Sequence, residues 1–221
     1  MFTAGPRKAR YNQGLRGGAV RRISDICTEG RFPDEPEANS ELARAKHIEA
    51  TMDDFLRCLA WTMQWEDPRL AYAVTSDNKG QVLSGINSEE WPEDFARIVA
   101  LPQAERPAAV AAFYQRCFWN QWLAQLGIEI QKRAFDCGVN EGSGVAIKLL
   151  QESVNVVRKV APFIAEDGLW GPKTATAANS VDQVALVATF IKGRCARYRQ
   201  IVVVNPADEP YLAEWLARAQ A

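Results

Sequence analysis

The sequence predicts a mainly α-helical fold that carries one small β-hairpin after its first long helix. Apolar residues recur at spacings of three and four through most of the chain beyond residue 39, which is the pattern of amphipathic helices. Residues 69–87 interrupt this pattern with short β-rich runs around a polar turn. With 221 residues, 48% of them hydrophobic, the chain can bury the core of one domain with extensions or of two small domains.

The first 38 residues differ in composition from the rest. Residues 1–22 contain six basic and no acidic side chains, and residues 1–38 are rich in Gly and Pro. Such a block is either a solvated arm or a docking segment for an acidic partner. We therefore divide the chain into a basic arm, 1–38, and a folded domain, 39–221. The net charge of −1 argues against general nucleic-acid binding, and only the charge of the arm would favour such a contact.

The sequence predicts no signal peptide, membrane span, metal site or cofactor. Gly, Asn and Gln follow the basic start instead of an apolar run, and no apolar run approaches the length of a membrane-spanning helix. The five cysteines are scattered, and none forms a CxxC pair or lies near the single histidine, His47. We expect reduced thiols and synthesis in a cytoplasm without a classical export signal.

The first long helix is expected to begin near Asn39 or Ser40, either of which can cap it, and to end before Pro68. Glu66 lies at its C-terminus beside Trp65. The negative end of the helix dipole and the apolar neighbours favour the protonated form of a carboxyl group. Glu66 is therefore a candidate general acid, and the alternative is a solvated glutamate at a helix end.

A hairpin and two helices should follow. Residues 71–75 and 81–83 read as strands around a Ser-Asp-Asn-Lys-Gly turn. A short helix is expected from about residue 88, and an amphipathic helix from about residue 107. Trp119, at the end of this second helix, is either a wall of a sugar-binding cleft or a core residue.

The stretch 133–151 is predicted to be the end of one helix, a glycine-rich turn and the start of another. Gly142 and Gly144 interrupt the helical pattern, because glycine ends helices and permits unusual dihedral angles. Asp136 and Asn140 lie four residues apart and so share one helix face. They either hold the turn from inside or line a cleft.

Three further helices complete the expected fold. The turn 166–174, which contains Trp170, leads into a helix whose first position suits a proline. A long helix is expected over about 181–203, and a short final helix over 209–219. The sequence shows no internal repeat at a solenoid period.

Four of these motifs, in this order, resemble glycoside hydrolase family 108, whose members are N-acetylmuramidases of lysozyme-like fold. Ala134-Phe-Asp-Cys-Gly-Val-Asn-Glu-Gly resembles the signature of the family, and Asp167-Gly-Leu-Trp-Gly-Pro-Lys-Thr resembles its peptidoglycan-binding turn. The segments 114–119 and 214–218 resemble its aromatic helix end and its closing motif. The resemblance covers roughly residues 50–220 and implies a lysozyme-like domain with a peptidoglycan-binding-like segment at 145–180.

The resemblance implies that Glu66 is the catalytic acid and that Asp77 is the carboxylate that orients water or stabilises positive charge. The active-site segment departs from the family pattern, because Asp67 and Pro68 stand where glycines are expected. Val82 likewise replaces a threonine that helps to place the water.

A hydroxyl from Ser84 or Thr75 would therefore have to substitute for that threonine. The candidate substrate-binding residues are Trp65, Ser84, Trp119, Asn140 and Trp170.

The implied function is hydrolysis of β-1,4 glycosidic bonds in peptidoglycan by a protein of phage origin. The enzyme would be either a free lysin or a part of the virion. In the virion, the partners of the basic arm would be other virion proteins, and the enzyme would open the wall locally. The alternative is a structural or adaptor protein of the virion that keeps a muramidase-like fold with weak or lost activity.

Overall fold

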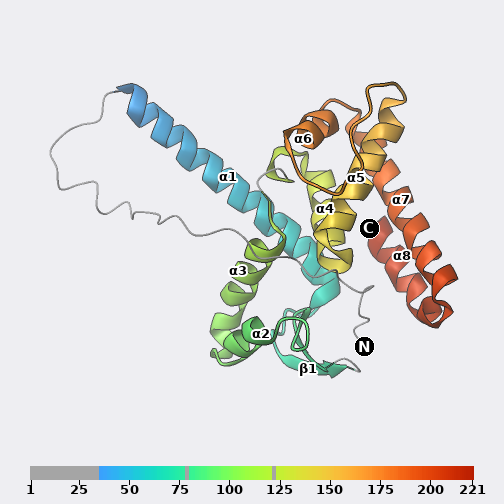
Figure 1. Cartoon of the computed structure of the whole chain (residues 1–221). Coiled ribbons are helices and arrows are strands. Elements are labelled where there is room, and N and C mark those ends of the chain that lie inside the picture. Colours follow the sequence, from blue (N-terminus) through green and yellow to red (C-terminus); the bar gives the residue numbers. More distant parts are fainter. Residues whose placement is uncertain (1–34, 78–79, 121–122) are drawn as a thin grey trace. The chain divides into compact units, whose positions relative to one another are not determined.

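The structure is a computed structural model that describes residues 35–77, 80–120 and 123–221 (Figure 1). The arm predicted for residues 1–38 lies almost entirely outside these ranges. The chain divides into two compact units, one of which contains Asp54–Ala221 while the other ends at Asp53. The site and the core described below belong to the unit that contains Asp54–Ala221.

The described chain is mainly helical with one small antiparallel sheet, which confirms the predicted fold class. The helices are α1 (Glu35–Glu66), α2 (Pro92–Val99), α3 (Arg106–Phe118), α4 (Ile128–Glu141), α5 (Ser143–Arg158), α6 (Pro172–Asn179), α7 (Gln183–Val204) and α8 (Leu212–Gln220). Short 3-10 turns η2 (Gln103–Glu105), η3 (Leu123–Gln125) and η4 (Pro206–Tyr211) connect some of them. The strands are β1 (Val74–Asp77), β2 (Gly80–Leu83) and β3 (Ile86–Asn87).

Several elements differ from the prediction, among them the first strand, which covers Val74–Asp77 instead of residues 71–75. Helix α1 begins at Glu35, before the capping residues Asn39 and Ser40, because a proline at position 36 is compatible with a first helical turn. The strand β3 was not predicted, since two residues are too few to show a period. It pairs with β2 through Leu83 opposite Ile86.

The register of the sheet separates a core face from a polar face. Leu83 and Ile86 are buried, and side chains alternate between the two faces of a strand. Val82 therefore points to the opposite side, where its partner on β1 is Thr75. This second face of the sheet borders the candidate site.

The α4–α5 hairpin lies at the centre of the core, with Gly142 between its helices at a φ of 100°. Phe135 of α4 forms edge-to-face contacts with Phe55 of α1 and with Trp119, at centroid distances of 6.0 Å. Trp119 also meets Phe55 at 5.6 Å. The ring contacts of Trp119 are thus those of a core residue.

A network of buried ions joins α4 to α7 and α8, which lie side by side (Figure 1). Asp136 is fully buried, and its carboxylate accepts a hydrogen bond at 2.8 Å from Arg194 of α7. Arg218 of α8 donates to the same carboxylate through Nε at 3.1 Å and through Nη2 at 2.8 Å. Burial opposes ionisation of Asp136, but the Arg218 and Arg194 charges outweigh it and lower its pKa.

The network continues one turn further along α4. Glu141 pairs with Arg194 at 3.3 Å and with Arg197 at 2.7 Å. Tyr198 donates from its hydroxyl to the amide oxygen of Asn140 at 2.7 Å. Asn140 and Asp136 therefore both make contacts that hold the hairpin against α7. To hold the turn from inside is one of the two roles considered for them.

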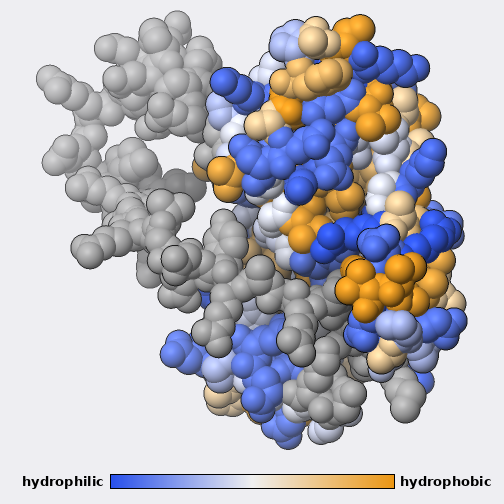
Figure 2. All heavy atoms as spheres, turned by 45° about the vertical axis from the view of Figure 1, so that its right-hand side comes forward, coloured by the Kyte–Doolittle hydropathy of each residue, from blue (hydrophilic) through white to orange (hydrophobic). Residues whose placement is uncertain are grey.

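Some large apolar side chains remain exposed, notably Val184, Val203 and Val204 near the two ends of α7. Figure 2 shows hydrophobic areas interspersed with hydrophilic ones on the face that it presents. Such scattered apolar exposure is ordinary for globular proteins.

We expect Asp136→Asn to destabilise the protein by about 3–5 kcal/mol at neutral pH, because it leaves buried arginines without their anion. The lowered pKa of Asp136 means that its contribution is present above its unfolded pKa of about 3.9. The contribution is lost as the pH falls through the folded value.

Urea unfolding at neutral and acidic pH should therefore show a gap between wild type and Asp136→Asn that narrows below about pH 4. Asp53→Asn, at an exposed position, is the control and should leave the midpoint unchanged. A gap that stays constant down to about pH 2 would contradict this role of the Asp136 charge.

Candidate active site

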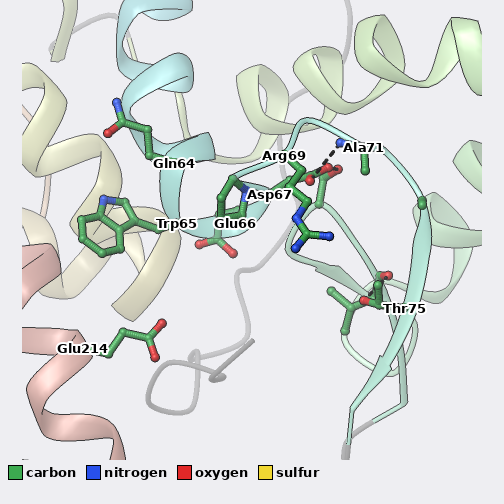
Figure 3. A pocket seen from close by; sticks show the side chains of 12 residues that line it. Gln64, Trp65, Glu66, Asp67, Arg69, Ala71, Thr75 and Glu214 are labelled. Carbon is green, nitrogen blue, oxygen red and sulfur yellow. Dashed lines mark hydrogen bonds between the residues drawn. The ribbon is translucent and has the colours of Figure 1, made fainter. Parts of the chain in front are cut away.

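A pocket of about 590 Å³ lies where the C-terminal end of α1 meets the sheet and α8 (Figure 3). Residues of α1, of the loop that follows it, of β1 and β2 and of α8 surround it. The lining residues are Gln64, Trp65, Glu66, Asp67, Pro68, Arg69, Ala71, Ala73, Thr75, Val82, Ser84 and Glu214.

Glu66 is the last residue of α1, and its carboxylate points into this pocket (Figure 3). The side chain is 17% exposed. Its Oε1 accepts a hydrogen bond at 2.8 Å from Nη2 of Arg218, which also binds Asp136. The buried ion network thus reaches the pocket and fixes the orientation of Glu66.

The guanidinium of Arg218 bridges a buried and a half-buried carboxylate. Burial opposes its charge, but Asp136 and then Glu66 raise its pKa. The sequence analysis missed this contact between Arg218 and Glu66. The two residues are 152 positions apart, so no local pattern could indicate the pair.

Gly85 lets the sheet approach Glu66 closely. Its φ of +78° suits glycine, and a Cβ at this position would overlap Oε2 of Glu66 and lie 2.6 Å from the hydroxyl of Tyr114. That hydroxyl donates to the carbonyl of Ser84 at 2.8 Å. Burial and the Glu66 charge raise the pKa of Tyr114, so the phenol keeps its proton for this bond.

Asp67 holds the loop that follows α1. Its buried carboxylate accepts from the backbone N–H groups of Ala71 at 3.0 Å and Tyr72 at 2.8 Å. It also accepts from the hydroxyl of Ser84 at 2.7 Å. Leu70 and Tyr72 have positive φ angles of 49° and 48°. The aspartate that replaces an expected glycine is thus a rigid anchor between the loop and the sheet.

The structure brings together some of the predicted site residues. Glu66, Trp65 and Ser84 line one pocket, together with Thr75. Asp77 is the last residue of β1 and pairs with Gly80, but its side chain lies outside the described part of the structure.

The other predicted residues lie elsewhere. Asn140 is buried and bonded to Tyr198, and Trp119 packs between Phe55 and Phe135. Neither lines the pocket of Glu66. Two charged residues that line it, Arg69 and Glu214, were missed. Both side chains project into the pocket in Figure 3.

A second pocket, of about 840 Å³, lies in the segment that resembles a peptidoglycan-binding turn. Trp170 lines it, together with the basic residues Arg158 and Lys173. Gln151 holds the turn in place, because it donates to Asp167 at 2.9 Å and accepts from the backbone N–H of Gly168 at 2.9 Å.

Neither a metal site nor a membrane span is found in the described ranges. No group of three or more His, Cys, Asp or Glu side chains there could hold a metal ion. None of the described helices is both long and apolar enough to cross a bilayer.

Comparison with known proteins relates the C-terminal part of the chain to peptidoglycan. Residues 145–220 match the model of a family described as a predicted peptidoglycan domain. Among solved structures, the chain is similar to Brucella abortus SagA, with a TM-score of 0.51 and 16% sequence identity over 75% of this chain and 93% of that one. No curated protein gives a significant match.

The helices and the small sheet are consistent with a mainly α, lysozyme-like fold, and the family match supports a relation of residues 145–220 to peptidoglycan. They do not single out glycoside hydrolase family 108.

We expect Gly85→Ala to destabilise the protein by about 1–3 kcal/mol, because the new Cβ is strained at positive φ and displaces the Glu66 carboxylate. Gly144→Ala is the matched control, since a Cβ there meets nothing within 4 Å and alanine is favoured in a helix by about 1 kcal/mol. Thermal unfolding of both variants, with a crystal structure of Gly85→Ala, tests this. An unshifted Glu66 in that structure would contradict the close approach.

Proposed function

We propose that this protein is a peptidoglycan hydrolase that cleaves β-1,4 glycosidic bonds of the glycan strand, with Glu66 as the catalytic acid. The observation that carries the proposal is the placement of Glu66. A half-buried carboxylate ends the first long helix, faces an open pocket beside a small sheet, and is oriented by Arg218. The peptidoglycan domain that residues 145–220 match supports the substrate class.

Cleavage of a glycosidic bond requires an acid that protonates the leaving oxygen and a second group on the opposite side of the sugar. Glu66 has the position for the first role. Arg218 holds one carboxylate oxygen, and Asp136 balances the charge of that guanidinium. The apolar ring of Trp65, on the same pocket wall, offers a surface for a sugar face.

The proposed site of action is the bacterial cell wall, and the resemblance to phage muramidases favours a phage protein. Asp77 remains a proposal for the residue that orients water. Asn140 and Trp119 also remain proposals as substrate-binding residues, although their described contacts are within the protein.

Trp170 and the pocket around it form a second proposed contact with peptidoglycan. The aromatic ring would pack against a sugar or a methyl group. Arg158 and Lys173 line the same pocket and match the carboxylates of the peptide stems. This contact would hold the polymer while the Glu66 pocket cleaves it.

Glu66→Gln should lower the rate of peptidoglycan cleavage by at least about 100-fold, because the amide cannot donate the proton that the leaving oxygen needs. The amide keeps the oxygen that accepts from Arg218, so the fold should persist. Mass analysis of the soluble fragments released from purified cell walls is the measurement, with circular dichroism as the folding control. Full activity in this variant would remove Glu66 from the mechanism.

In the Glu66→Gln background, Trp170→Ala should weaken binding to insoluble peptidoglycan by about tenfold, as expected for the loss of an aromatic anchor. Val160→Ala changes an exposed apolar residue of the same segment outside this pocket and should bind unchanged. Cosedimentation gives both affinities. Equal binding by the two variants would argue against the Trp170 contact.

A second candidate is a structural or adaptor protein of the virion with a muramidase-like fold and little activity. The observation in its favour is that the hydroxyl of Ser84 already donates to Asp67 and that of Thr75 to the carbonyl of Val82. Wild type that binds cell walls but releases no more fragments than Glu66→Gln would support this candidate over the enzyme.

A further inference from the structure

Glu214 is the carboxylate of the pocket that the sequence analysis did not consider. It lines the pocket from α8 and is exposed, with no hydrogen bond or ion pair among the contacts of the described residues. Figure 3 shows its carboxylate directed into the pocket and facing the end of α1 that carries Glu66. Two carboxylates from distant parts of the chain thus face one open space.

The fold ties the placement of Glu214 to that of Glu66. Residues 214 and 218 are one turn apart and share a face of α8, and Arg218 donates to Glu66 at 2.8 Å. The neighbouring Trp215 is buried against Tyr198, at a centroid distance of 5.4 Å, which fixes the rotation of α8. The contact that orients Glu66 therefore also positions Glu214.

Three other polar groups of the pocket, those of Asp67, Ser84 and Thr75, already form hydrogen bonds within the protein. The carboxylate of Asp67 accepts three hydrogen bonds from the protein. The hydroxyl of Ser84 donates to Asp67, and that of Thr75 donates to a carbonyl. Of the lining carboxylates whose side chains the structure describes, Glu214 is the one that is exposed and available to a water molecule.

We propose that Glu214 is the general base that activates the attacking water, an inference that rests on the proposed glycosidase function. The two carboxylates enter the pocket from different elements: Glu66 ends α1 with one oxygen held by Arg218, and Glu214 lies on α8, where it is exposed to water.

In the reaction, Glu214 accepts a proton as the water oxygen bonds to the anomeric carbon. The bond from that carbon to the leaving oxygen breaks, and Glu66 gives its proton to this oxygen. Exchange with solvent then restores both carboxyl groups. Direct attack by water inverts the configuration of the anomeric carbon.

The test compares Glu214→Gln with Glu209→Gln, an exposed glutamate of η4 that does not line the pocket. Glu214→Gln should lower kcat on soluble glycan fragments by about 100-fold or more, with KM and the melting temperature unchanged, while Glu209→Gln matches wild type. Formate should restore part of the activity of Glu214→Ala, because it can replace the missing base, and should not restore Glu66→Gln. Proton NMR of the fresh wild-type product should show the inverted anomer.

Four results would overturn the inference. Glu214→Gln within twofold of Glu209→Gln, with Glu66→Gln inactive, would remove Glu214 while the glycosidase function stands. Loss of activity in Asp77→Asn alone would assign the water to Asp77, and a retained anomer would exclude direct attack by water. Wild type that releases no fragments would overturn the proposed function and this inference with it.

Discussion

The guanidinium of Arg218, held between Asp136 and Glu66, is the interaction on which the rest of the site depends. A buried arginine is tolerated only where anions and acceptors satisfy it, and Asp136 does so with contacts to both Nε and Nη2. The Nη2 group of Arg218 also donates a hydrogen bond to Oε1 of Glu66, at 2.8 Å. The orientation of Glu66 is therefore set by the buried charge of Arg218, which lies between α8 and α4.

This arrangement gives the α4–α5 hairpin a chemical role as well as a packing role. Asp136 of α4 forms an ion pair with Arg194 of α7, and Glu141 of α4 forms ion pairs with Arg194 and Arg197 of α7. Because Asp136, Glu141 and Arg194 are buried, loss of their ion pairs would leave charges uncompensated in the core, and this requirement fixes α4 against α7. A side chain aimed by such a scaffold is held more precisely than one that depends on a loop.

Local patterns in the sequence predicted most of the elements but not the contacts between them. Periodicity predicted the helices and the hairpin, and the proline after Glu66 located the end of α1. The pairing of Glu66 with Arg218 joins positions 152 residues apart, and the periodicity of a helix or strand relates only residues a few positions apart. No local pattern around Gly85 indicates that its missing side chain makes room for Glu66. The sequence pattern of Trp119 fits either of its two roles, and it did not show that the ring packs against Phe55 and Phe135.

The departures from the family pattern around Glu66 have a structural meaning that the sequence alone did not show. Asp67 stands where the family pattern has a glycine, and its carboxylate accepts three hydrogen bonds that connect the loop to Ser84. That anchor uses the Ser84 proton, and Val82 has no hydroxyl, so neither of these two residues can meet the demand for a hydroxyl that holds a water molecule. A carboxylate that enters the pocket from α8 removes that demand on the hairpin. The rigid loop and Glu214 are in this sense complementary, because the loop then shapes the pocket while α8 brings the polar group that the loop lacks.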